Sequence, residues 1–256
     1  MSERFYSSRP INSDHVTLDG PEAHHLLHVM RAATGDVVTL FDGRGAEFQA
    51  VVETLRRSEA DLKIIERHNI NRELPFPLVI GVALPKGDRQ KWLVEKLTEL
   101  GAAALAPLIT ERSVAQPSGN VLERLRRAVI EAAKQCGRNR LMMIAEPQLW
   151  HQWINDNCES QVSDCGISEQ SAVRNPQSEI CKPRRLVAHR DGPPSSQIDW
   201  TSRVPTQIAV GPEGGFTNAE LEAAEAAGWQ IVSLGPRTLR TETAAVALAA
   251  SVTLAR

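Results

Sequence analysis

The residues best suited to chemistry form a glycine-rich stretch, GPEGG at 211–215, which follows an apolar run. Thr217 and Glu220 have the spacing of a capping box, so a helix should begin directly after this stretch. Its glycines allow positive φ and close approach of a ligand, and a loop that enters a helix N-terminus can bind an anion. The pattern is neither GxGxxG nor a Walker loop, which gives no support to dinucleotide or nucleoside triphosphate binding. Taken alone, it is as compatible with a simple turn as with a binding loop.

A second stretch, LGPRTLRTET at 234–243, has a similar design. A strand should end at its Gly-Pro turn, and Thr241 should cap the helix that follows. Arg237 and Arg240 precede this helix N-terminus, where the helix dipole disfavours cations. We therefore expect a bound anion, or an ion pair with Glu213 or Glu242, to offset the repulsion. A structural salt bridge and a substrate contact explain the arginines equally well.

Charge is distributed unevenly along the chain, although the formal net charge is only −2. Residues 77–145 contain eleven Lys and Arg against six Asp and Glu, whereas the segments on both sides are acidic. This middle block is where a nucleic-acid backbone would be met. The predicted RNA phosphate contacts are Lys86, Arg89, Arg112 and Arg138. The alternative is that these side chains serve solubility or pair with neighbouring glutamates.

Composition excludes several classes of protein. The four cysteines, Cys136, Cys158, Cys165 and Cys181, form no CxxC pair, so we expect no metal site. No apolar run is long enough to span a bilayer, and the first residues have no apolar signal-peptide core. We therefore expect a cytoplasmic protein with no membrane partner.

The elements that must position these stretches change character along the chain. Residues 1–72 contain short alternating strands separated by turn residues, with one helix at 21–31, and this pattern predicts a small barrel. Prolines at 75 and 77 favour an extended linker. From 77 to 256 apolar strands alternate with amphipathic helices, which predicts an α/β domain. Within it, the polar and aperiodic residues 155–182 predict a flexible insertion.

The two glycine-containing stretches, GPEGGFT and LGPRTLRTETA, together resemble the bacterial 16S ribosomal RNA uridine N3-methyltransferases of the SPOUT class. Residues 86–89 (KGDR), 98–101 (TELG) and 111–113 (ERS) also match this family, as do 24–26 (HHL) in the first domain. The resemblance covers about residues 3–140 and 184–254. The chain departs from the family pattern at Thr238, where Ile or Val is usual, and in the run that follows His189.

The resemblance implies a PUA-like β-barrel followed by a SPOUT α/β domain whose C-terminal segment forms a trefoil knot. It also implies a homodimer, S-adenosylmethionine as the methyl donor, and 16S ribosomal RNA, within the small subunit, as the partner. By carry-over from the family, the cofactor-binding residues would be His189, Gly211, Pro212, Glu213, Gly214, Gly215, Leu234, Gly235, Thr238 and Leu239.

Methylation of uracil N3 requires removal of the N3 proton, because the protonated nitrogen is a poor nucleophile. Our hypothesis is that Arg240 stabilises the resulting anion and that Glu213 or Glu242 accepts the proton. Two other readings stay open at this point. One is a SPOUT methyltransferase that acts on another RNA atom, such as a ribose 2′-hydroxyl. The other is a non-catalytic RNA-binding assembly factor.

Overall fold

The computed structural model describes residues 3–114, 117–156 and 183–254. Its residues form two compact units, which are described separately. The first comprises Met1–Glu73 with Ile130–Leu141, and the second comprises Leu74–Val129 with Met142–Arg256. The predicted insertion at 155–182 lies outside the described residues except for its first two positions. The predicted boundary at 72–77 stays a prediction, and the sequence did not indicate that Ile130–Leu141 would group with the first unit.

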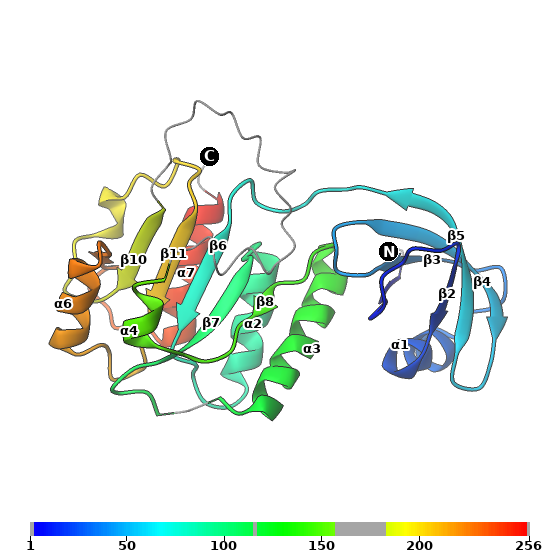
Figure 1. The fold of residues 1–256 in the computed structure, drawn as a ribbon, viewed down its shortest axis with the longest axis horizontal. Helices are drawn as coiled ribbons and strands as arrows, with labels where there is room; N and C mark the ends of the chain where they lie inside the picture. The colour runs from blue at the N-terminus through cyan, green and yellow to red at the C-terminus, as the bar shows by residue number, and fades with distance from the viewer. Residues whose placement is uncertain (1–2, 115–116, 157–182, 255–256) are drawn as a thin grey trace. The chain divides into compact units, whose positions relative to one another are not determined.

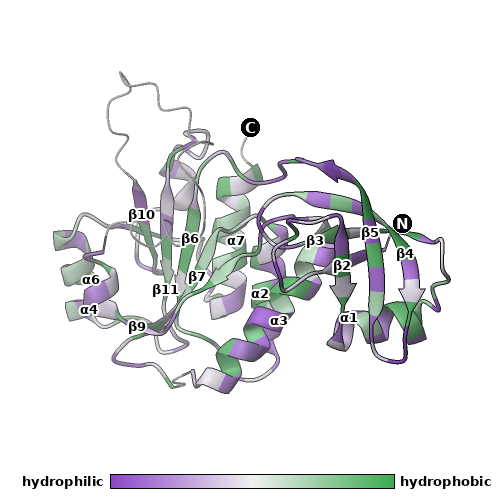
Figure 2. Ribbon diagram, turned by 45° about the vertical axis from the view of Figure 1, so that its right-hand side comes forward, coloured by the Kyte–Doolittle hydropathy of each residue, from purple (hydrophilic) through white to green (hydrophobic). Residues whose placement is uncertain are grey.

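The first unit is built on a mixed five-stranded sheet of order β1-β3-β4-β5-β2 (Figure 1). Its strands are β1 (Arg4–Tyr6), β2 (His15–Leu18), β3 (Val37–Phe41), β4 (Glu47–Leu55) and β5 (Ala60–His68). β1 pairs with β3 in parallel and the other pairs are antiparallel. Hydrophobic and hydrophilic residues alternate along β5 (Figure 2), because only one side of the strand faces the core.

One helical segment covers this core, as predicted for 21–31, but it changes type. It begins as α1 (Gly20–His24) and continues as a π-helical turn, η1 (His25–Val29). Ala23 and Leu26 are buried against the sheet beside Phe5, Leu40 and Phe48. The hydrophobic spacing therefore located the helix correctly but could not reveal the wider turn.

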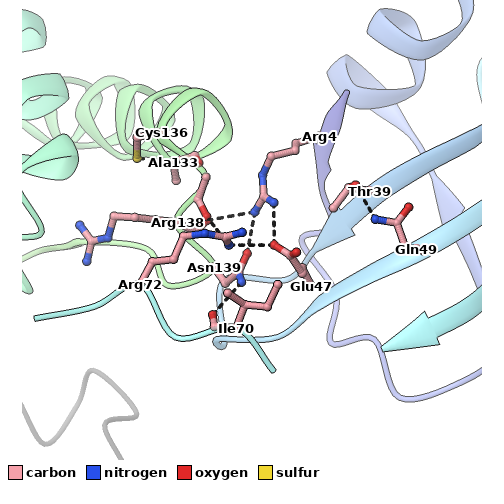
Figure 3. Close-up of polar contacts among 11 residues, drawn as sticks. Arg4, Thr39, Glu47, Gln49, Ile70, Arg72, Ala133, Cys136, Arg138 and Asn139 are labelled. Carbon is pink, nitrogen blue, oxygen red and sulfur yellow. Dashed lines mark hydrogen bonds and ion pairs between the residues drawn. The ribbon is translucent and has the colours of Figure 1, made fainter. Parts of the chain in front are cut away.

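Residues Ile130–Leu141 are joined to the rest of the first unit by polar contacts next to the ion pairs of Glu47 (Figure 3). The Glu47 carboxylate accepts from the Arg4 guanidinium at 2.8 Å and from Arg72 at 2.9 Å. Arg4 also donates to the Asn139 side chain at 2.6 Å. Lys134 pairs with Glu22 at 3.0 Å. The segment is thus linked to β1 through Arg4 and to α1 through Lys134.

The second unit contains a parallel sheet of order β12-β10-β11-β6-β7-β8, with β9 paired to β7. Its strands are β6 (Leu78–Val82), β7 (Ala104–Ile109), β8 (Met143–Ile144), β9 (Gln148–Leu149), β10 (Arg184–Ala188), β11 (Thr206–Val210) and β12 (Gln230–Val232). Its helices are α2 (Arg89–Glu99), α3 (Gly119–Cys136, whose last residues belong to the first unit), α4 (Trp150–Trp153), α6 (Asn218–Ala226) and α7 (Thr241–Leu254), together with the short 3-10 turn η2 (Ser195–Gln197). The predicted strand–helix alternation is confirmed.

Helices cover both faces of this sheet (Figure 1). On one face α4 and α6 pack with Trp150, Trp153 and Trp229 into an aromatic cluster, and the Trp153 ring lies directly over Gly81 of β6. On the other face α7 packs against β6 and β11 and is flanked by α2. β6 and β11 are buried along their whole length, as expected for strands covered on both sides.

The predicted fold class is confirmed as a PUA-type sheet unit followed by a parallel α/β unit. The trefoil knot that the resemblance implies stays a prediction. Within the described ranges, no helix has the length and apolarity needed to cross a membrane. In the same ranges, no three His, Cys, Asp or Glu side chains group closely enough to hold a metal ion. Of the cysteines only Cys136 lies in the described part of the chain.

Candidate active site

Loops that follow five parallel strands meet at one edge of the second sheet. β6, β7, β10, β11 and β12 run in the same direction, so their carboxyl ends lie along the same edge. Ligands of open α/β sheets usually bind outside these ends. A cavity of about 460 Å³ lies here, lined by residues from the loops after β7, β10, β11 and β12.

The loop after β11 carries the GPEGG stretch. Gly215 adopts φ +68°, which favours glycine, and its N–H donates to the Pro212 carbonyl at 2.8 Å. A Cβ atom at Gly211 would lie 3.0 Å from the Phe216 ring, so the backbone passes close to that ring. Thr217 and Glu220 form the predicted capping box, with reciprocal side-chain to backbone bonds that fix the start of α6.

The loop after β12 forms a second wall of the cavity. Gly235 adopts φ +109°, again in the region that favours glycine. Thr241 was predicted to cap α7, but it is the first residue of that helix. Its hydroxyl instead donates to the Gly211 carbonyl at 3.1 Å, which joins the start of α7 to the GPEGG loop.

The loop after β10 supplies the third wall. The His189 N–H donates to the Val232 carbonyl at 3.0 Å, and the Ser233 N–H donates to the Pro193 carbonyl at 2.7 Å. These bonds extend the pairing of β10 and β12 beyond the strands. Gly192 is needed in this loop, because a Cβ atom there would lie 2.9 Å from the Val232 backbone nitrogen.

The loop after β7 is hydrogen-bonded to the GPEGG loop and to the start of α6. The Arg112 guanidinium donates to the Gly214 carbonyl at 2.8 Å, and the Glu111 N–H donates to the Glu220 carboxylate at 2.9 Å. Thr110 and Ser113 bond to each other within the turn. Arg112 was predicted to contact RNA phosphate. It is exposed and lines the cavity, and one of its donors is committed to the loop.

The structure brings together all ten residues predicted to bind the cofactor. Each of them lines the same cavity: His189, Gly211, Pro212, Glu213, Gly214, Gly215, Leu234, Gly235, Thr238 and Leu239. Sequence reasoning did not assign Asp191, Phe216 and Asn218, which also line it. Asn218 follows the capping residue of α6, and this position next to a helix N-terminus was a usable signal.

The three predicted catalytic residues are placed differently. Glu213 lines the cavity, whereas Arg240 and Glu242 are absent from its lining. Glu242 is buried in the first turn of α7, and Arg240 is exposed. The expected ion pair of Arg237 or Arg240 with Glu213 or Glu242 is not found among the described residues, and the alternative of a bound anion stays a prediction. Arg89 makes both ion pairs, at 3.2 Å to Glu213 and 3.7 Å to Glu242.

The remaining predicted RNA contacts also differ in their surroundings. Lys86 is exposed at the end of the segment after β6. Arg138 has only 5% of its side chain exposed and pairs with Glu73 inside the first unit, where its main-chain carbonyl also accepts from Arg4 (Figure 3). This burial contradicts the predicted phosphate contact, because a guanidinium must reach the surface to meet a backbone phosphate.

Comparisons with known proteins agree with this arrangement. Residues 72–253 match a family described as an RNA methyltransferase domain, and residues 18–65 match an RNA methyltransferase PUA domain. The ribosomal RNA small subunit methyltransferase E of Synechocystis is 37% identical over 91% of this chain and 71% of its own length. The chain belongs to this methyltransferase E family.

Solved structures resemble the chain over its full length. The methyltransferase E of Neisseria gonorrhoeae, bound to S-adenosylmethionine, has a TM-score of 0.80 with 28% identity, covering 99% of this chain and 98% of that one. A methyltransferase of Legionella pneumophila in complex with the same cofactor has a TM-score of 0.83 with 26% identity, covering 100% and 98%. The family resemblance inferred from the GPEGG and LRTET stretches is thereby confirmed.

Proposed function

We propose that this protein is an S-adenosylmethionine-dependent methyltransferase that methylates N3 of a specific uridine in 16S ribosomal RNA of the small subunit. The observation that carries the proposal is that all ten predicted cofactor residues, drawn from three separate loops, line one cavity. Membership of the methyltransferase E family supports the RNA substrate, and the PUA match supports RNA binding by the first unit.

The cavity fits the cofactor in size and chemistry. Its volume of about 460 Å³ lies in the range of sites for molecules of this size. The walls combine glycine backbone at Gly211, Gly214 and Gly235 with the apolar side chains of Leu234 and Leu239. Free backbone N–H and C=O groups can read an adenine edge, while the leucines pack against the ring. Asp191 and Glu213 place carboxylates at the wall, which suits a cationic sulfonium ligand.

The reaction requires proton removal as well as positioning. S-adenosylmethionine supplies an electrophilic methyl group: N3 forms the bond to carbon, the carbon–sulfur bond breaks, and its electron pair remains on sulfur. Residues of the chain must therefore orient the uracil and accept the N3 proton. Arg240 is the proposed cation for the uracil anion. Within the described residues its guanidinium makes no hydrogen bond or ion pair that would compete for it.

RNA contacts near the cavity are proposed for Lys86 and Arg112. Lys86 is exposed, and Arg112 lies on the rim with part of its donor capacity directed to Gly214. Both follow strands whose carboxyl ends form the edge of the cavity, so a bound strand would meet them beside the cofactor. Aromatic side chains account for only 4% of the sequence, so the target base is expected to enter the cavity by flipping rather than by stacking on rings.

The homodimer that the family resemblance implies has a suitable surface on α7 and α2. Trp92 of α2 is 43% exposed and Leu254 of α7 is 70% exposed. α7 also presents the half-buried Val246, Ala247 and Ala250 at helical spacing. Small residues permit close helix packing, and exposed apolar groups favour burial. We therefore propose that a second copy of this chain covers this face.

The proposed activity is tested by incubating the protein with radiolabelled S-adenosylmethionine and small ribosomal subunits that lack the modification. Nucleoside chromatography of the RNA then identifies the product, and we expect the label in 3-methyluridine. Label in another nucleoside would refute the N3 assignment and point to a different atom, such as a ribose hydroxyl. No label together with no cofactor binding in calorimetry would refute the enzyme and leave an RNA-binding protein.

A further inference from the structure

Arg89 occupies an unusual place for a side chain of the basic block. It is the first residue of α2, and it pairs with two carboxylates from different parts of the chain. One guanidinium nitrogen lies 3.2 Å from Glu213 and the other lies 3.7 Å from Glu242. The planar guanidinium can bridge two acceptors in a fixed geometry, which an ammonium group does less well.

Glu242 fixes one side of this bridge. Only 8% of its side chain is exposed, and its Oε2 atom has no hydrogen-bond partner within the described residues. A buried carboxylate is costly unless a cation or a helix N-terminus stabilises it. Glu242 has both, since it lies in the first turn of α7 and pairs with Arg89. The guanidinium is therefore held between α2 and α7.

Glu213 forms the other side of the bridge and faces a different environment. Its side chain is 46% exposed, and it belongs to the wall of the cavity. The other titratable and charged groups on the wall are Arg112, His189, Arg190, Asp191 and Arg237. The Asp191 carboxylate lies on an exposed loop beside His189 and Arg190. Among the charged groups of the wall in the described part of the chain, Glu213 is the one whose ion-pair partner, Arg89, is itself held by a buried carboxylate, that of Glu242.

We infer that Arg89 is a positioning residue: anchored by Glu242, it holds the Glu213 carboxylate at the cavity wall, where that carboxylate accepts the uridine N3 proton. The inference rests on the proposed function and divides the roles of the two glutamates. Glu213 meets the substrate and Glu242 acts through Arg89. In the step itself the N3–H bond breaks, the proton passes to a Glu213 oxygen, and N3 gains the methyl group.

A double-mutant cycle on methyl transfer tests this arrangement. Glu213→Gln should lower kcat about 100-fold, the lower end of the range for a lost general base. Arg89→Gln should lower kcat about 10- to 100-fold through misplacement of that base. In the Glu213→Gln background, Arg89→Gln should cost less than about twofold, because residues that act as a unit are non-additive.

The assay also separates positioning from RNA binding. The KM for RNA and the calorimetric affinity for S-adenosylmethionine should change less than about threefold in Arg89→Gln. The reason is that Arg89 is inferred to position the base and not to bind either substrate. Arg89→Lys keeps the charge and should recover only part of the activity if it folds and binds the cofactor normally. Lys91→Gln is the matched control, because it removes an exposed cation from the same helix, and its kcat should equal that of the wild type.

Three results would overturn the inference. The two single effects could multiply in the double variant, which would make Arg89 independent of Glu213. Arg89→Gln could raise the KM for RNA with kcat unchanged, which would return Arg89 to the phosphate contacts. Glu213→Gln could retain wild-type turnover, which would exclude it as proton acceptor. The wild-type protein is measured first in the same assay, so failure of the proposed activity appears there and failure of this inference appears only in the variants.

Discussion

Glu47 should contribute strongly to the stability of the first unit, in a way that depends on pH. Only 8% of its side chain is exposed, and its carboxylate accepts hydrogen bonds from both Arg4 and Arg72 (Figure 3). Burial by itself would raise the pKa of Glu47, but the hydrogen bonds from Arg72 and Arg4 outweigh it and hold the pKa at about 2, against an ordinary value of 4.5.

The size of the effect follows from this difference in pKa between the folded and unfolded chain. The lowering of the pKa from 4.5 to about 2 corresponds to about 3 kcal/mol in favour of the folded state. Because the folded pKa is the lower one, this stabilisation is fully present above about pH 5 and is lost as the pH falls toward 2. At pH 3 about 1 kcal/mol should remain.

Glu47→Gln is the appropriate perturbation, since glutamine has nearly the shape of the protonated acid. The free energy of unfolding of the first unit should fall by about 3 kcal/mol at pH 7 and by only about 1 kcal/mol at pH 3. All five tryptophans lie in the second unit, so their fluorescence would not report on this change. The free energy of unfolding of the first unit is instead measured in urea titrations at each pH, with pulsed hydrogen exchange of peptides from β3 and β4 as the readout.

Two results would refute the reasoning about Glu47. One is a stability at pH 7 within about 0.5 kcal/mol of the wild type, which is the range of surface substitutions. The other is a loss of equal size at pH 7 and pH 3, which would assign the effect to packing rather than to charge. Glu59→Gln is the control. It breaks an exposed pair with Arg56 and should change stability by less than about 0.5 kcal/mol.

Three further substitutions, one of them a control, test the packing and the loop connections of the second unit. Gly81→Ala would place a Cβ atom 2.6 Å from the Trp153 ring, so it should destabilise the unit by about 1–3 kcal/mol through overpacking, measured by urea unfolding with tryptophan fluorescence. Gly119→Ala, with no atom within 4 Å of the new Cβ, should be neutral or slightly stabilising in the same titration. Thr241→Val removes the hydroxyl bond to the Gly211 carbonyl, which is worth about 1 kcal/mol, and should weaken S-adenosylmethionine binding about fivefold in calorimetry. Unchanged affinity in that variant would show that the bond does not hold the loop.

Periodicity and turn residues predicted most of the elements, because local sequence determines where an amphipathic or fully buried segment begins and ends. The short strands predicted within residues 1–72 are found, among them β3 and β4, and so are apolar strands after residue 77, such as β7. The helix α4 was not predicted. It has only four residues, and its tryptophans show no helical repeat, so its conformation depends on packing against the sheet.

The cofactor loops were predicted by residue type, whereas the partners of charged side chains were not. Glycine at positions of positive φ, such as Gly215 and Gly235, leaves a signal in the sequence itself. An ion pair leaves none when its members lie far apart in the chain. Arg138 illustrates this, because its glutamate partner lies in the linker before the second domain and only the folded first unit brings them together.

In the basic block at 77–145, the topology of the parallel sheet brings arginine side chains to groups of the protein itself. Arg89 and Arg112 follow β6 and β7, and the carboxyl ends of these strands lie at the same edge as that of β11. Arginines at this edge therefore meet the GPEGG loop, where Arg112 bonds the Gly214 carbonyl and Arg89 pairs with Glu213. The excess of Lys and Arg in this block is consequently larger than the number of side chains that are free to contact RNA phosphates. Lys86, which is exposed and lies one turn before α2, is the side chain of this group for which a direct RNA contact remains the simplest explanation.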